Sequence, residues 1–357
     1  MLRRGGLPSA RHFWGSAMGL TRYLLMAVGL LLVQPLAASA QSTAEQVRKR
    51  GTLLCGVDGA LPGLSFLNAV KEWEGMDVDL CRAVAAAVLG DAKKVTFVPV
   101  TASYRFDKLA AGVFDILARN STVTLQRSAG KNVRFAVINY IDGQAFVVPK
   151  RLKVEQLANL SGSTVCLAKG TTHEFNMASW FKARRLNITP ATFETTDAMY
   201  EAFFANRCAA VTADATALAG VVVRSGRAIE YMMLPDVISK EPLGPYVRNG
   251  DSPWLDIVRW THYAMLEAEE RGINARNIDS LKRELGDPYL RVLLGVDPGN
   301  GTVLGLSEDW VYNIVSQVGN YGDVYERNVG MGSPLKFARG VNALWSKGGL
   351  MYPLPLR

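Results

Sequence analysis

Short apolar segments alternate with predicted helices along most of this chain, and the alternation restricts its possible folds. The apolar segments of a first run are residues 52–57, 94–98 and 115–118. Apolar residues with helical spacing lie between them, at about 80–88 and 106–111. A second run has predicted strands at 164–167, 192–194 and 209–212, with a helix at 175–181. This order predicts an α/β fold in which each run forms a sheet flanked by helices.

The first 40 residues have the pattern of an export signal. A basic leader without acidic residues precedes the apolar run 24–33, and Ala38-Ser39-Ala40 offers the small residues of a cleavage site. The apolar run is too short for a membrane-spanning helix, which needs about 20 residues. We expect cleavage near Ala40 and a mature protein in the periplasm; the alternative is an uncleaved signal that anchors the chain.

Charge and length limit the function and the domain count. The whole chain has a formal charge of +8, and four of its arginines lie in the predicted signal. The mature charge is therefore mild, and no basic block with interleaved aromatic residues follows, so we expect no nucleic-acid partner. The remaining length of about 317 residues predicts two domains.

Four cysteines in an exported chain favour disulfides, and three pairings are possible. The local pairs Cys55–Cys81 and Cys166–Cys208 would each lie within one run of strands and helices, so we predict these two. Buried free thiols are the alternative. We expect no metal site, because the sequence has no C-x-x-C and its three histidines are scattered.

The chemically most informative stretch follows the third predicted strand. Asn120, Ser121 and Thr122 place hydrogen-bonding groups at the strand end, and Thr122 or Thr124 could cap a helix that carries Arg127. Ligands bind at the carboxyl ends of strands in open α/β sheets, and a guanidinium suits a carboxylate. The alternative is a surface arginine after an ordinary turn.

Two turns in the second run also follow predicted strands. Gly170-Thr171-Thr172 offers N–H groups and hydroxyls near a helix start, and Asp214 offers an anion for an ammonium group. Taken alone, each turn is better explained as a helix cap.

The segment from Asp115 to Arg127 resembles the first-lobe signature of periplasmic amino-acid-binding proteins, the receptors of ABC importers. Residues 119–122, Arg-Asn-Ser-Thr, are closer still to the general L-amino-acid-binding subgroup. The likeness extends in register over nearly everything after about residue 45. The further motifs lie at residues 170–172, 212–214, 239–245, 259–264, 319–322, 326–330 and 342–345.

The resemblance implies a two-lobed periplasmic-binding-protein fold with a hinge. Lobe 1 would comprise residues 41–148, lobe 2 residues 149–240, and residues 241–357 would return to lobe 1 and add a helical extension. The implied protein is a monomer that binds an L-amino acid and meets the membrane permease of an ABC importer, without a cofactor. Its implied ligand-binding residues are Arg127, Asn120, Thr122 and Thr172 for the α-carboxylate, Asp214 for the α-ammonium, and Asp58 and Phe106 in the pocket.

Three residues depart from the family pattern and bear on the side-chain preference. Leu61 stands where distant relatives have an aromatic ring, Val123 replaces a tryptophan, and Asp58 replaces a small residue. Asp58 would favour cationic ligand side chains, whereas the neighbouring Arg119 would oppose them.

Two alternatives to a transport receptor remain. One is a dehydratase-like enzyme on the same fold, although the sequence has no GxGxxG after a strand, no P-loop, no GxSxG and no HExxH. The other is a ligand-sensing partner of a membrane receptor, which would use the same pocket.

Overall fold

A computed structural model describes residues 41–284 and 286–356 of the chain. The predicted export signal, residues 1–40, lies outside the described residues. Within the described part of the chain, no helix is both long enough and apolar enough to cross a membrane.

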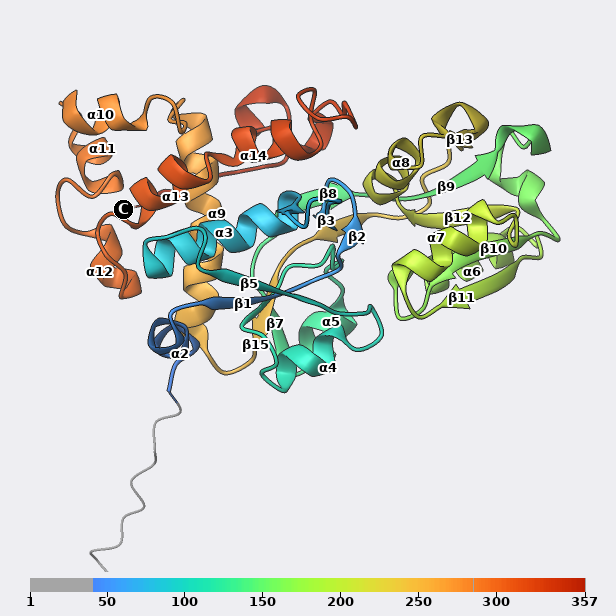
Figure 1. Cartoon of the computed structure of the whole chain (residues 1–357), viewed down its shortest axis with the longest axis horizontal. Coiled ribbons are helices and arrows are strands. Elements are labelled where there is room, and N and C mark those ends of the chain that lie inside the picture. Colours follow the sequence, from blue (N-terminus) through green and yellow to red (C-terminus); the bar gives the residue numbers. More distant parts are fainter. Residues whose placement is uncertain (1–40, 285, 357) are drawn as a thin grey trace, which may run out of the picture. The chain divides into compact units, whose positions relative to one another are not determined.

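Five strands form a first sheet in the order β5-β1-β6-β15-β7 (Figure 1). β1 is parallel to β5 and β6, whereas β15 is antiparallel to both β6 and β7. The strands are β1 (Leu53–Val57), β5 (Val95–Pro99), β6 (Ile116–Leu117), β7 (Val133–Phe135) and β15 (Tyr246–Arg248). A strand from beyond the second sheet therefore completes the first one.

Alternating side chains of β1 cover the two faces of this sheet. Leu53 and Cys55 pack with residues of α3 (Met76–Leu89), whereas Leu54 packs on the opposite side, in the cluster that contains Leu109 of α4 (Arg105–Ala110). We call this sheet and its helices the first lobe.

A second sheet has the order β11-β10-β12-β9-β13. β10 is parallel to β11 and β12, and β9 is antiparallel to β12 and β13. The strands are β9 (Gln144–Pro149), β10 (Thr164–Ala168), β11 (Thr189–Phe193), β12 (Ala210–Asp214) and β13 (Tyr231–Met233). We call this sheet and its helices the second lobe.

Helices cover both faces of the second sheet. The cluster of Phe146, Val165 and Phe181 joins one face to α6 (Thr172–Ala183). The opposite face packs against α7 (Thr196–Phe204) and α8 (Ala215–Arg224). The predicted α/β class, with helices on both faces of a sheet, is confirmed.

The chain passes between the lobes through two paired strands. β8 (Tyr140–Asp142) is antiparallel to β14 (Glu241–Leu243). The sequence placed residues 144–148 before the crossover, but β9 pairs on both sides within the second sheet. All six residues of β9 are buried, so the strand has no exposed face. Its sequence pattern therefore does not show to which of the two sheets it belongs.

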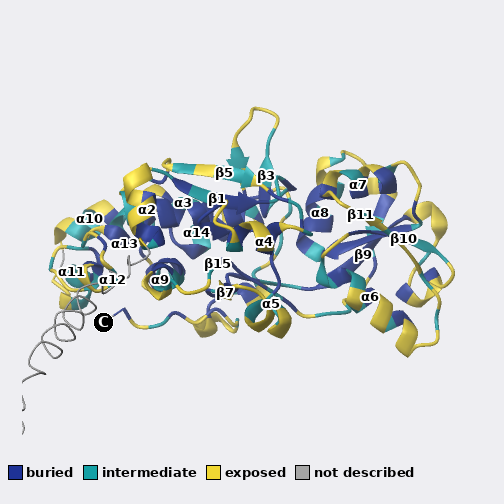
Figure 2. Ribbon diagram, turned by 90° about the horizontal axis from the view of Figure 1, so that it is seen from below, coloured by how far each residue is buried: buried dark blue, intermediate teal, exposed yellow. Residues whose placement is uncertain are grey.

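The segment after β15 packs on the first lobe, as the sequence predicted. α9 (Ser252–Glu270), α13 (Trp310–Gln317) and α14 (Tyr321–Asn328) contact α3, and Figure 2 shows buried residues along α3 and α9. The remaining helices are α2 (Thr43–Arg50), α5 (Leu125–Gly130), α10 (Ile278–Glu284), α11 (Pro288–Leu293) and α12 (Asn300–Leu304). Short strands β2 (Ala60–Leu61), β3 (Ser65–Leu67) and β4 (Trp73–Glu74) form a separate small sheet.

The two local cysteine pairs are disulfides in the structure. Cys55 of β1 bonds to Cys81 of α3, with the Cα atoms 6.3 Å apart. Cys166 of β10 bonds to Cys208, with the Cα atoms 5.7 Å apart. Each bond lies within one lobe, so neither restricts movement between the lobes.

Candidate ligand-binding site

Two hydrogen bonds and one left-handed residue hold the shape of the loop after β6. Thr124, rather than Thr122, caps α5: its hydroxyl accepts from the Arg127 N–H at 3.2 Å. Asn120 has φ +31°, a left-handed conformation that asparagine adopts more readily than most residues. The Asn120 N–H donates to Asp77 Oδ2 at 2.8 Å. Burial raises the pKa of Asp77 to about 7, although this hydrogen bond favours the charged form.

Arg127 is positioned by its own loop and by an aromatic ring. Its guanidinium donates to the Thr122 carbonyl at 2.9 Å and lies 5.5 Å from the centre of the Phe106 ring. Phe106 is buried and packs edge-on against Tyr246, so it supports Arg127 from within the first lobe. Burial lowers the pKa of Arg127, whereas Tyr246, Glu241 and Asp214 raise it.

Asp214 ends β12 and occupies the N-cap position of α8, but its side chain makes no capping hydrogen bond. Its carboxylate instead contacts His173 Nε2 at 3.2 Å and accepts from Asn120 Nδ2 at 2.8 Å. Asp214 is only 1% exposed. The helix-cap interpretation therefore does not account for this side chain, which joins the second lobe to the first-lobe loop.

Glu241 of β14 is a buried carboxylate between the two lobes. Thr122 and Thr172, whose hydroxyl oxygens are 3.4 Å apart, both donate to its Oε2 atom. Asn176 and Ser239 donate to Oε1, at 2.8 and 2.5 Å. The two threonines predicted to hold a ligand carboxylate thus contact a carboxylate of the protein itself.

Sequence reasoning did not single out Glu241, although it lies in one of the motifs that carry the resemblance. The available signal was an acidic residue followed directly by Pro242 in the segment that leaves the second lobe.

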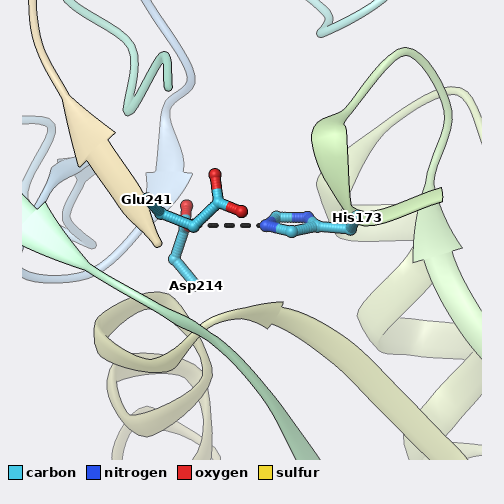
Figure 3. A group of neighbouring side chains, drawn as sticks. All are labelled: His173, Asp214 and Glu241. Carbon is cyan, nitrogen blue, oxygen red and sulfur yellow. Dashed lines mark hydrogen bonds and ion pairs between the residues drawn. The ribbon is translucent and has the colours of Figure 1, made fainter. Parts of the chain in front are cut away.

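His173, Asp214 and Glu241 converge, with ligand-type atoms within 4.8 Å of one another (Figure 3). Side chains of this kind can bind a metal ion. Here, however, the His173–Asp214 contact and the four neutral donors to Glu241 already account for their arrangement. Two buried carboxylates this close together create a strongly negative region that suits an ammonium group.

Positive charge gathers on the first-lobe side of the same region. Arg105 is buried and donates to the carbonyls of Ala102 and Gly170, at 2.5 and 3.3 Å. Burial and the neighbouring Arg127 and Arg119 lower the pKa of Arg105. Separate regions of opposite charge are the complement that a zwitterion requires.

Asp58 forms a buried ion pair with Arg119. The same carboxylate accepts from the Thr196 hydroxyl of the second lobe at 3.0 Å. A cavity lies here, with Asp58, Leu61, Arg119 and Asn120 among its lining residues, and Arg127 and Phe106 lie outside that lining. Its volume of about 20 Å³ has room for about one water molecule, so an amino acid can enter only if the lobes or side chains move.

The fold agrees with that of known proteins. Residues 53–276 match the bacterial extracellular solute-binding proteins, family 3. The chain belongs to this family. The predicted family membership and the periplasmic-binding-protein fold are both confirmed.

Two known proteins and one solved structure are similar to this chain over most of their length. The general L-amino acid-binding periplasmic protein AapJ of Rhizobium johnstonii is 44% identical over 340 residues, 94% of this chain and 99% of that protein. The glutamate/glutamine/aspartate/asparagine-binding protein BztA of Rhodobacter capsulatus is 43% identical over 320 residues, 90% and 95% of the two chains. The structure of an ABC transporter periplasmic binding protein from Brucella ovis with glutathione bound is 44% identical, with a TM-score of 0.86. The match covers 89% of this chain and 100% of the Brucella ovis chain.

Proposed function

We propose that this protein is a periplasmic receptor that captures L-amino acids between two closing lobes and delivers them to the permease of an ABC importer. The observation that carries the proposal is the separation of charge in the cleft. Arg127, with Arg105 nearby, lies on the first-lobe side, and Asp214 lies at the end of β12 in the second lobe. The names of the similar proteins support an amino-acid ligand.

In this proposal Arg127 holds the ligand α-carboxylate, helped by Asn120, Thr122 and Thr172. The two threonine hydroxyls would turn from Glu241 Oε2 to the ligand. Asp214 and the released Glu241 would then receive the α-ammonium group. Because these groups come from both lobes and from β14, the ligand stabilises the closed state, which is what drives a hinge motion.

Native mass spectrometry of freshly purified mature protein tests the class of ligand. We expect a co-purified amino acid, or an amino acid that binds when added, and recovery of the ligand unchanged after release. A chemically altered product would support the dehydratase-like alternative instead. Failure to bind any L-amino acid in calorimetry would overturn the proposal.

The proposal includes export and action as a monomer. Edman sequencing or mass spectrometry of the exported protein should give an N-terminus near Gln41. An intact Met1–Ala40 segment would contradict cleavage of the signal.

A further inference from the structure

We propose that Asp58, Arg119 and Tyr200 form a subsite without net charge that selects ligands with an uncharged polar side chain, best matched by a carboxamide. This inference rests on the proposed amino-acid-binding function. It concerns the cavity that lies beyond the zwitterion-binding groups and is lined by residues of both lobes.

The Asp58–Arg119 pair is fixed in place from several sides. Both side chains are about 95% buried, with exposed fractions of 4% for Asp58 and 5% for Arg119. Arg119 Nε donates to the Val100 carbonyl at 2.8 Å, and Asp58 accepts from the Ala60 N–H at 3.1 Å. The pair cannot turn towards solvent without breaking these bonds, so a ligand side chain meets both charges together.

Arg119 keeps hydrogen-bonding capacity for a ligand. Its contacts with Val100, Asn120 and Asp58 use three of the five guanidinium N–H donors. The other two donors have no acceptor among the described residues. A ligand carbonyl oxygen in the cavity can therefore accept from Arg119 while the ion pair stays intact.

Tyr200 supplies an independent indication that a polar group belongs here. Its side chain lines the cavity and is 3% exposed, yet its hydroxyl has no hydrogen-bond partner in the part of the chain that is described. Burial raises the pKa of this hydroxyl, and the carboxylates of Asp58 and Asp214 raise it further, so it is neutral and able to donate. A buried hydroxyl without a partner is unfavourable, and a polar ligand atom would satisfy it.

The charges of the subsite discriminate between ligand classes. A carboxylate side chain is attracted by Arg119 but repelled by Asp58. An ammonium side chain is attracted by Asp58 but repelled by Arg119. A carboxamide has an acceptor oxygen beside a donor NH₂ group, which matches the donor Arg119 beside the acceptor Asp58. The preference for cationic side chains that Asp58 alone suggests is therefore cancelled by its partner.

Calorimetry at pH 7 with L-glutamine, L-glutamate, L-lysine and L-alanine tests the subsite. We expect the wild-type protein to bind glutamine at least about tenfold more tightly than glutamate or lysine, because each charged side chain faces a like charge in a buried site. Asp58→Asn leaves Arg119 unopposed and should lower the ratio of glutamine to glutamate affinity by about tenfold or more. Tyr200→Phe removes one hydrogen bond and should lower glutamine affinity about fivefold more than alanine affinity.

Tyr140→Phe is the matched control, since Tyr140 is also a buried tyrosine but bonds to Thr216 and lies outside the cavity lining. It should leave the ratio of glutamine to alanine affinity unchanged. Tight binding of glutamate or lysine by the wild type, or unchanged ratios in both Asp58→Asn and Tyr200→Phe, would overturn the subsite while leaving the receptor function intact. Binding of no amino acid by the wild type would overturn both.

Discussion

Replacement of Asp214 by asparagine removes one negative charge from the cleft while keeping the shape of the side chain. Asp214 is only 1% exposed, so water can do little to replace it. Loss of one partner from a buried, hydrogen-bonded charge pair costs about 2–5 kcal/mol. Relief of the repulsion between Asp214 and the nearby Glu241 offsets part of this loss. We therefore expect Asp214→Asn to weaken binding by about 3 kcal/mol, or roughly 150-fold.

Isothermal titration calorimetry with L-glutamine and N-acetyl-L-glutamine identifies the ligand group that Asp214 contacts. Acetylation removes the ammonium charge, so it should weaken binding strongly in the wild type and only slightly in Asp214→Asn. Asp236→Asn is a suitable control, because Asp236 accepts from the Leu157 N–H and lies outside the cavity lining. Asp214 does not hold the ammonium group if Asp214→Asn binds glutamine with an affinity within about threefold of the wild type. The same conclusion follows if acetylation of the ligand weakens binding to Asp214→Asn as much as it weakens binding to the wild type.

Three further predictions follow from individual residues. Gly170→Ala should weaken ligand binding at least about tenfold, because a Cβ at residue 170 would lie 2.8 Å from Ser103 Cα across the cleft. Gly162→Ala is the control and should keep normal affinity, since Gly162 has a similar φ of +81° but no atom within 4 Å of an added Cβ. Asp77→Asn should flatten the pH dependence of stability. The native state keeps a proton at Asp77 up to about pH 7, whereas the unfolded chain releases it near pH 4. The free energy of unfolding therefore falls as pH rises between these values, by up to about 1.4 kcal/mol per pH unit. If urea unfolding between pH 4 and 7 shows the same dependence of this free energy on pH in Asp77→Asn as in the wild type, Asp77 is not the cause. The double variant Cys166→Ser/Cys208→Ser should lose about 3–4 kcal/mol of unfolding free energy but still bind ligand at 25 °C; an unchanged thermal midpoint would contradict a stabilising role.

The sequence predicted those features that depend on local pattern. The threonine cap of α5 and the apolar strand β1 follow from residue type and spacing over a few positions, although the choice between Thr122 and Thr124 stayed open. The position of Asp214 at the end of β12 was predicted in the same way. These elements needed no knowledge of how the lobes meet.

The contacts between distant segments could not be read from the sequence. Asp58 and Arg119 are 61 positions apart, and Thr122 and Glu241 are 119 apart. Nothing in the local sequence of Tyr200 distinguishes a tyrosine at a cavity from one in a core. These contacts between distant segments decide the chemistry of the site, and they exist only once the chain has folded.

The order β5-β1-β6-β15-β7 in the first sheet also bears on how the chain folds. The second sheet is drawn from one continuous stretch, Gln144–Met233, and has its own disulfide. The first sheet lacks an inner strand until Tyr246–Arg248 arrives, and closing a contact over so long a stretch is slow. Residues 144–233 therefore contain every strand of their own sheet, whereas residues 53–135 need β15 to complete theirs. Pairing of β15 with β6 and β7 also accompanies the placement of the preceding residue Glu241 between Thr122 and Thr172.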